Sequence, residues 1–414
     1  MKKFYSFIFV LCLISSNSLF AADVITLTTT DAINTVLTAY SGTGDDVTVV
    51  IPAGYTSPEF TGAVASNIII PTTIKNLIIK GDGTNPTLLM KGFTLPASSL
   101  TSLTVKDITL KGAVDPVSGG VSLTSYVAQS AVVVPSVTLD NCTIANFRGV
   151  FRMNAGNNFT NVVINNCIIR NIGNYNVFNP GGTLTNLTIS KSTFYGINGN
   201  VFALSVTSPV PYPTAVTISD CTFADIDYVG AKYLIDLGTA NTTTALTITN
   251  TILGKTLASG SNAKGINFGA TYTVTNSYTT TDWVTSANAV VGFTAYVNAQ
   301  SSLFKSPSVY TVDATGTEAT VGDYTLIDNT IGKVGDPRWY TASSGVISPK
   351  SSSTSISYNG TEILLNEVQD INIYSVTGEL LKSAKNVNLL SVANLSKGIY
   401  IVKAGTTAQK FIVK

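Results

Sequence analysis

Val137-Thr138-Leu139-Asp140-Asn141-Cys142-Thr143-Ile144 is one copy of an eight-residue pattern that recurs along the chain. In every copy the first and third positions are large and apolar, and most copies have Asn or Asp at the fifth position. Neighbouring copies start 25 to 34 residues apart, which is the period range of stacked repeat architectures. The other copies are LTVKDITL (103–110), VVINNCII (162–169), LTISKSTF (187–194), VTISDCTF (216–223), LTITNTIL (246–253) and YTVTNSYT (272–279).

The pattern has a direct physical reading. Alternate residues of a strand face opposite sides, so positions one and three face one side and position two, which is mostly Thr, faces the other. Asn and Asp tolerate the left-handed backbone of a sharp corner, after which positions six and eight resume the apolar side in a second short strand. One coil cannot bury its apolar side alone, whereas stacked coils share a continuous interior. The sequence therefore predicts an all-β fold, a right-handed parallel β-helix, and weaker copies at Val47 and Leu77 raise the number of coils to about nine.

The composition excludes several kinds of function. The chain contains no histidine, which excludes acid–base catalysis by histidine and metal sites built on histidine. Its formal charge is +1, and loss of Lys2 and Lys3 with a signal peptide would leave 22 basic and 23 acidic residues, a net charge of −1. A balance this close to zero argues against nucleic acid and against an anionic membrane as partners.

The N-terminus has the features of a secretory signal peptide, predicted over residues 1–22. Two lysines are followed by an apolar core at residues 4–14 and by small residues at the exit. No later apolar run is long enough to span a bilayer, so no transmembrane segment is expected in the mature chain. Residues 30–39 then predict a short amphipathic helix, capped by Thr or Asp, that covers the N-terminal end of the solenoid.

The repeat fades beyond residue 279, and residues 280–340 are expected to form the last irregular coils and a C-terminal cap of a β-helix domain spanning residues 23–340. Three motifs mark this region: LFKSP (303–307), DYTL (323–326) and VGDPRW (334–339). Their order resembles the closing segment of a family of uncharacterised secreted β-helix proteins of Bacteroidota. The coils more loosely resemble the pectate lyase and chondroitinase B superfamily. These resemblances imply a fold and a habitat, and they imply no reaction.

A Ser-rich linker at residues 341–355 precedes a small β-sandwich domain predicted over residues 356–414. Its three motifs are INIYSVTGELL (371–381), LSKGIYIVK (395–403) and KFIVK (410–414). They resemble the type A sorting domain of the type IX secretion system. This resemblance implies export across an outer membrane, contact with the secretion machinery, and removal of the domain by a sorting peptidase. The mature protein is then expected outside the cell, either secreted or attached to the outer surface.

The mature chain keeps Cys142, Cys167 and Cys221, each at the sixth position of its copy. Cys142 and Cys167 fall on adjacent coils, so a disulfide is one possibility. A buried ladder of free thiols is the favoured alternative, because free cysteine is commonly buried. A zinc site is not indicated, since the chain has neither histidine nor a CxxC pair.

Candidate binding residues gather around another strand of each coil. Three of the four arginines fall within 23 residues. If the large apolar residues of this strand face inward, Arg152, Asn179, Ala203 and Asp236 line one outer strip. One interpretation is a glycan groove with an acidic rim, and the other is a set of surface ladders that satisfy backbone groups at the corners. The candidates are Arg148, Arg152, Arg170, Asn179, Asp225, Asp227, Tyr228, Lys232, Tyr233 and Asp236.

The sequence favours a secreted or cell-surface β-helix protein that binds carbohydrate, or acts as an adhesin, without turnover. The alternative is a polysaccharide lyase acting on a uronate polymer, which needs a Lys or Arg base and either Ca²⁺ or a cation beside the uronate. No other cofactor is expected, and no catalytic residue is assigned. In the coils the glutamates are Glu59 and Glu318, which disfavours a glycosidase built on paired carboxylates.

Overall fold

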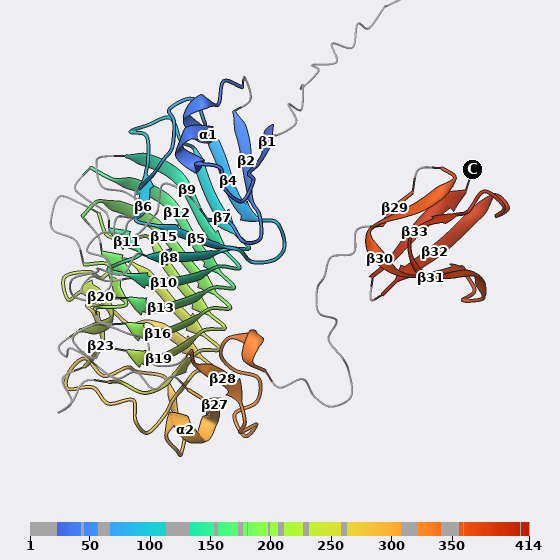
Figure 1. Ribbon diagram of the computed structural model, residues 1–414. Coiled ribbons are helices and arrows are strands. Elements are labelled where there is room, and N and C mark those ends of the chain that lie inside the picture. The colour runs from blue at the N-terminus through green and yellow to red at the C-terminus, as the bar shows by residue number, and fades with distance from the viewer. Residues whose placement is uncertain are drawn as a thin grey trace, which may run out of the picture. The chain divides into compact units, whose positions relative to one another are not determined.

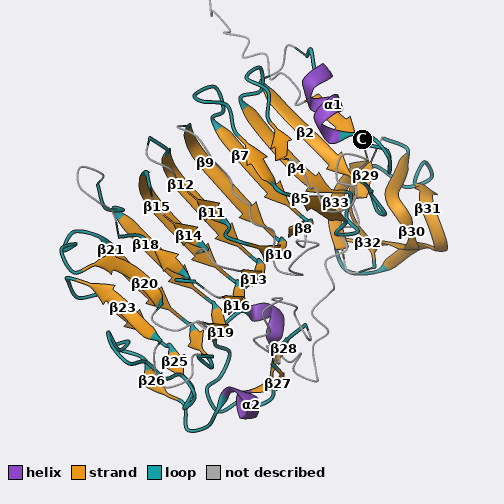
Figure 2. Ribbon diagram, turned by 60° about the vertical axis from the view of Figure 1, so that its left-hand side comes forward, coloured by secondary structure: helices purple, strands orange, loops and turns teal. Residues whose placement is uncertain are grey.

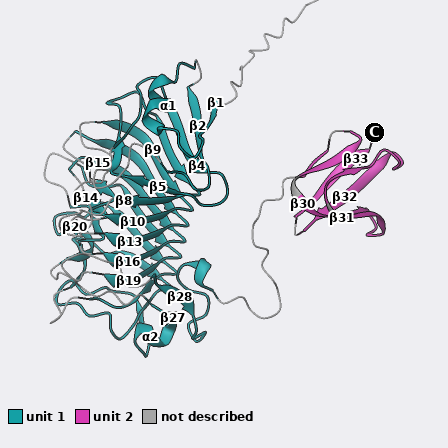
Figure 3. Cartoon of the chain, viewed as in Figure 1, with its two compact units in different colours: residues 1–341 teal, residues 342–414 magenta. Residues whose placement is uncertain are grey.

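The chain forms two compact units, residues 1–341 and residues 342–414, and each is described by itself (Figure 3). The computed structural model describes residues 23–42, 45–56, 67–112, 132–152, 156–172, 177–179, 181–197, 199–205, 211–226, 232–257, 263–307, 321–340, 356–358, 360–405 and 407–413. The expected signal peptide, the whole expected linker at residues 341–355, Asp227 and Tyr228 lie outside these residues.

The first unit is a parallel β-helix (Figures 1 and 2). Its largest sheet has ten strands, and each pairs in parallel with the equivalent strand of the next coil. Nine of the ten carry the nine copies of the pattern, and the solenoid makes about eight turns, against the nine or so predicted. The strands are, in order, β1 (Asp23–Thr26), β2 (Asp46–Ile51), β4 (Asn76–Gly81), β7 (Ser102–Lys106), β9 (Val133–Asp140), β12 (Asn158–Asn165), β15 (Thr183–Ser190), β18 (Ala215–Ser219), β21 (Ala245–Thr249) and β24 (Thr273–Thr275).

Two further sheets complete most coils, and a short pair, β3 (Asn67–Ile69) and β6 (Gly92–Thr94), lies near the N-terminal end. The nine-stranded sheet contains β5 (Thr87–Met90), β8 (Thr109–Gly112), β10 (Thr143–Phe147), β13 (Ile168–Ile172), β16 (Thr193–Ile197), β19 (Thr222–Ile226), β22 (Ile252–Leu253), β25 (Tyr278–Thr279) and β26 (Thr294–Ala295). The five-stranded sheet contains β11 (Phe151–Arg152), β14 (Phe178–Asn179), β17 (Phe202–Ala203), β20 (Tyr233–Gly238) and β23 (Lys264–Phe268).

The corner between the first two sheets is the fifth position of the pattern. In all seven clear copies this residue has a positive φ, between 45° and 55°. Six of the seven are Asn or Asp, the residue types that enter this region most readily apart from glycine, and the seventh is Lys191. Their side chains also join neighbouring coils: the Asn141 amide donates to Asp107 at 2.8 Å, and the Asn166 amide donates to Asn141 at 3.0 Å.

The interior follows the predicted alternation. In the copy that starts at Val162, positions one, three, six and eight are fully buried, whereas the second position is half-buried on the outer side. Aromatic side chains stack between coils inside the solenoid: the ring centroids of Phe151 and Phe178 lie 5.1 Å apart, and those of Phe194 and Phe223 lie 4.8 Å apart. The inward and outward assignment made from the sequence is therefore confirmed.

The three described cysteines are free and buried. Each thiol donates to a nearby carbonyl: Cys142 to Val105 and Asp140, both at 3.3 Å, and Cys221 to Ser219 at 3.1 Å. Burial raises the pKa of the Cys221 thiol well above its usual value. Such thiols are poor nucleophiles, so the column packs as small apolar residues do.

The N-terminal helix α1 (Ile33–Ala39) lies at that end of the solenoid and is shorter than the predicted 30–39 (Figure 1). The expectation of a Thr or Asp cap is wrong, because the N-cap is Ala32 and no side chain caps the helix. Asp31 instead accepts a hydrogen bond from the Thr28 amide in the preceding turn. Burial of Ile33 and Leu37, rather than capping, holds the helix in place.

Residues 300–307 and 321–340 form a lateral strap, the name we use for this segment below. It comprises α2 (Gln300–Leu303), the antiparallel pair β27 (Phe304–Ser306) and β28 (Asp323–Leu326), and the short 3₁₀ helix η2 (Pro337–Trp339). The expected C-terminal cap thus packs against the side of the solenoid. A second hydrophobic core joins strap residues to the outward residues of the nine-stranded sheet: Leu303, Phe304, Tyr324, Leu326 and Val334 with Tyr195, Ala224 and Ile252.

The second unit is a small antiparallel β domain with its own core. Its strands are β29 (Ile356–Tyr358), β30 (Glu362–Ser375), β31 (Leu380–Ser391), β32 (Gly398–Ala404) and β33 (Thr407–Val413). Val402, Ala404 and Phe411 are among its buried core residues. Across the described part of the chain, no helix is long and apolar enough to cross a membrane.

The strand register makes a testable distinction between two positions on paired strands. Ile164→Asp would bury an unpaired carboxylate between coils, and we expect it to cost several kcal/mol of unfolding free energy. Thr138→Asp, at an outward position on the neighbouring strand, should cost under about 1 kcal/mol. Denaturant titration of both variants measures the two costs, and equal destabilisation would refute the register.

Candidate functional site

The predicted outer strip lies on the five-stranded sheet. Phe151, Phe178, Phe202 and Ile235 are buried in the interior, and each is followed by one residue of the predicted strip. The backbone register aligns these followers from coil to coil: Arg152 with Asn179, Ala203 with Asp236, and Asp236 with Asn267. Only the backbones of Arg152 and Asn179 are described.

Asn267 is a member of this strip that the sequence reasoning missed. Ile266-Asn267 repeats the apolar and polar order of Ile235-Asp236, so extending the alignment by one coil would have found it. The Asn267 amide donates to the Asp236 carboxylate at 2.7 Å, and the Gly238 amide donates to the same oxygen at 3.2 Å. This end of the strip therefore holds a carboxylate oriented by an amide of the next coil.

Tyr233 and Lys264 lie beside this pair on the same two strands. The Lys264 ammonium is 5.0 Å from the centroid of the Tyr233 ring, a cation–π arrangement. Ala203, one coil before Asp236, is only 8% exposed, so the strip is interrupted at β17. Its described part is a half-buried cluster with an aromatic ring, an ammonium, a carboxylate and an amide.

The predicted arginine cluster is divided between two sheets. Arg170 lies on β13 of the nine-stranded sheet, and its register partner on the next coil is Tyr195. Burial raises the pKa of Tyr195, and the neighbouring Arg170 guanidinium partly opposes that rise. Arg152 lies on β11, in the five-stranded sheet, and half-buried Arg148 lies between β10 and β11. The structure therefore does not bring Arg170 and Arg152 to one strip.

Asp225 is buried at the end of β19 and does not form an acidic rim. Its carboxylate accepts hydrogen bonds from the Gln300 amide at 2.8 Å and from the Tyr324 hydroxyl at 3.0 Å, both of them strap residues. Lys232, just before β20, is half-buried.

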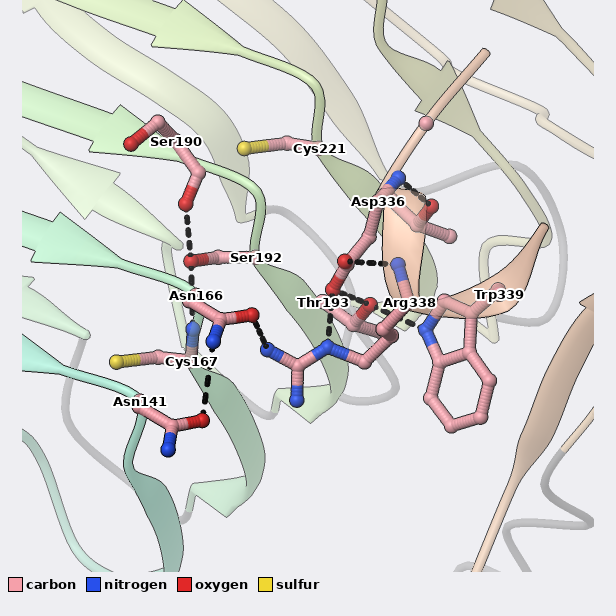
Figure 4. A network of polar contacts seen from close by, with 12 residues as sticks. Asn141, Asn166, Cys167, Ser190, Ser192, Thr193, Cys221, Asp336, Arg338 and Trp339 are labelled. Carbon is pink, nitrogen blue, oxygen red and sulfur yellow. Dashed lines mark hydrogen bonds and ion pairs between the residues drawn. The ribbon is translucent and has the colours of Figure 1, made fainter. Parts of the chain in front are cut away.

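The GDPRW motif forms the densest polar network of the strap (Figure 4). The Asp336 carboxylate caps η2 by accepting from the Arg338 amide at 3.0 Å, and it forms an ion pair with the Arg338 guanidinium at 2.8 Å. The Thr193 hydroxyl donates to the same carboxylate at 2.7 Å, and the Trp339 indole donates to Thr193 at 2.7 Å. The network also contacts β19, the next strand of the nine-stranded sheet, because the Asp336 amide donates to the Thr222 hydroxyl.

Arg338 also completes the Asn and Asp ladder of the corner. Asn166 would receive a hydrogen bond from an Asn at position 191, but that residue is Lys191. The Arg338 guanidinium donates to the Asn166 side-chain oxygen at 2.8 Å instead. The motif quoted from the sequence thus has a structural role, which is to fasten the strap to the coils.

Within the described ranges, no group of three or more His, Cys, Asp or Glu residues is placed to hold a metal ion.

Comparison with known families matches two parts of the chain. Residues 58–197 match a family described as a domain of unknown function (DUF4957). The matched segment ends with β16 and includes neither the later coils nor the strap. Residues 348–414 match the secretion system C-terminal sorting domain. Comparisons with curated proteins and with solved structures found no match. The chain thus carries a type IX secretion sorting domain on a β-helix, and the protein is secreted or displayed on the outer cell surface.

Gly335 tests how closely the strap approaches the sheet. It has a φ of +87°, and an added Cβ would lie 2.6 Å from the Thr222 hydroxyl and 3.0 Å from Ile252. We expect Gly335→Ala to lower the unfolding free energy by about 2 kcal/mol or more. Gly332→Ala is the matched control, because Gly332 also has a positive φ but nothing lies near its Cβ position, leaving a cost of about 1 kcal/mol. Equal losses in thermal or denaturant unfolding would contradict this close packing.

Asp336 makes the stability of the folded protein depend on pH. Burial raises the pKa of Asp336 from 3.8 to about 6, although the Arg338 guanidinium opposes the rise. The folded state therefore holds this proton to a higher pH than the unfolded chain does, so its contribution to stability falls as pH rises from 3.8 to about 6. Relative to Asp336→Asn, the wild type should lose about 3 kcal/mol across that window and show no further change above it. Parallel pH dependences of the two unfolding free energies would contradict the raised pKa.

Proposed function

We propose that the exported β-helix binds an extended glycan along the five-stranded sheet, without turnover. The observation that supports this is the register that aligns one strip position from coil to coil, together with the half-buried Asp236–Asn267 pair at its described end. Coils repeat every ~4.8 Å, so Arg152 and Asp236, three coils apart, are separated by roughly 14 Å. Charges at that distance do not pair with each other, and they suit contacts with successive units of a polymer.

The chemistry of the described end of the strip fits sugar hydroxyls. The Asp236 carboxylate accepts hydrogen bonds, and the Asn267 side chain both donates and accepts them. Tyr233 offers an apolar ring with a polar tip, and Lys264 beside it favours an acidic group. Together with Lys232, these residues would take a glycan that carries carboxylates or sulfates as well as hydroxyls.

The location of the protein supports the same proposal. A secreted or surface-displayed protein meets polysaccharides outside the cell, and long regular sheets give extended surfaces rather than enclosed sites. A polysaccharide lyase is the alternative, and it differs from a binder by forming unsaturated products that absorb in the ultraviolet. Both ideas are tested with one set of glycans.

The test is a glycan array on the mature protein, followed by calorimetry with the glycans that bind. Asp236→Ala and Asn267→Ala should each weaken binding about tenfold or more, which corresponds to the loss of about 1.4 kcal/mol. Arg152→Ala should weaken binding and reduce its dependence on salt. Thr247→Ala, on the outer face of the ten-stranded sheet, is the control and should bind as the wild type does.

Thermal unfolding of each variant separates loss of binding from loss of structure. If no glycan binds the wild type, or if Thr247→Ala weakens binding as much as Asp236→Ala, the strip is not a glycan site. Release of ultraviolet-absorbing products would replace the binding proposal with the lyase alternative.

A further inference from the structure

The C-terminal domain has an apolar surface on the outer face of its sheet. Ile399 and Ile401 on β32 are 44% and 37% exposed, and Ile412 on β33 is 48% exposed. The antiparallel register pairs Ile399 directly with Ile412. These three side chains therefore form one patch on two adjacent strands.

The patch continues across the two neighbouring strands. Tyr374 of β30 is the register partner of Ile401, and Leu380 of β31, 52% exposed, is the partner of Tyr374. We call the surface formed by Tyr374, Leu380, Ile399, Ile401 and Ile412 the outer apolar face. It crosses four strands of one sheet.

The domain does not need this face for its own folding. Val402, Ala404 and Phe411, on the other side of the same strands, already form the core. A sheet with one solvated face normally alternates apolar and polar residues, whereas β32 reads Gly-Ile-Tyr-Ile-Val-Lys-Ala and is apolar on both sides. Exposed apolar surface on a sheet invites aggregation, so its presence here indicates a surface that is covered by a partner.

The charges beside the patch indicate what that partner carries. Among the outward residues of β32 and β33, the charged ones are Lys403 and Lys410, and both are basic. Lys410 is the register partner of Ile401, so one lysine lies within the apolar rows. A complementary surface would combine apolar side chains with carboxylates.

We propose that the outer apolar face is the surface by which a protein of the secretion machinery holds this domain during export. The match to a sorting domain indicates that the partner belongs to that machinery. The patch and its lysines indicate that the partner's surface is apolar and bordered by Asp or Glu. The contact would be made by the folded sheet, because its residues are adjacent only after β30, β31, β32 and β33 have paired.

The test uses the full-length chain produced in a bacterium that has this secretion system. Ile399→Thr combined with Ile412→Thr keeps β-branched side chains and so keeps the strands, but it removes the apolar contact. We expect the fraction of protein found outside the cell to fall at least tenfold. Val368→Thr is the matched control, since Val368 is 61% exposed on the same domain and no register pair places it in the patch. Its export should equal that of the wild type.

A second variant covers the case in which the double substitution unfolds the domain. Lys403→Glu combined with Lys410→Glu leaves the core untouched, and it should reduce export by a similar factor because it repels an acidic partner. Normal export of either folded variant would overturn the proposal. Two other results would also overturn it. If the wild type binds anionic vesicles and the Thr variant does not, the face binds lipid. If the wild type self-associates in sedimentation and the Thr variant does not, the face binds a second copy of the chain.

Discussion

The solenoid depends on one backbone constraint, the left-handed residue at the corner of each coil. A single residue with φ near 50° turns the chain from the ten-stranded sheet to the nine-stranded sheet, and the same position does this in seven consecutive coils. Most residues resist that conformation, so Asn and Asp occupy it and their side chains then bond to the coil above or below. The corner thus sets both the path of each coil and its alignment with its neighbours.

The coils were predictable because their determinants are local. Alternation with a period of two and an Asn or Asp at a fixed place occur within eight residues, and repetition makes the signal strong. The strap was not predictable in the same way. Thr193 and Asp336, which its network joins, are 143 residues apart in the sequence, and nothing in residues 321–340 repeats the coil pattern. The VGDPRW motif is distinctive in the sequence, but the residues that it contacts could not be predicted from it.

The candidate site shows the same division. The register of Arg152, Asn179 and Asp236 followed from the inward phenylalanines and isoleucines, and the structure has it. Arg170 and Asp225 were grouped with them because they are close in sequence, yet a coil changes direction within a few residues and both lie on the nine-stranded sheet. Asp225 also contacts strap residues that are 75 and 99 positions away in the sequence. Its burial could therefore not be predicted from neighbouring residues.

The strap has a consequence for how this repeat protein can change in length. From Gly335 to Trp339 it contacts four successive coils, through Asn250, Thr222, Thr193 and Asn166. Inserting or deleting one coil inside that span would shift part of this contact set by ~4.8 Å and leave Asp336 or Arg338 without its partner. In this solenoid the coils under the strap, which carry the copies from residue 162 to residue 253, form a block of fixed copy number, and changes in length are confined to the coils outside it.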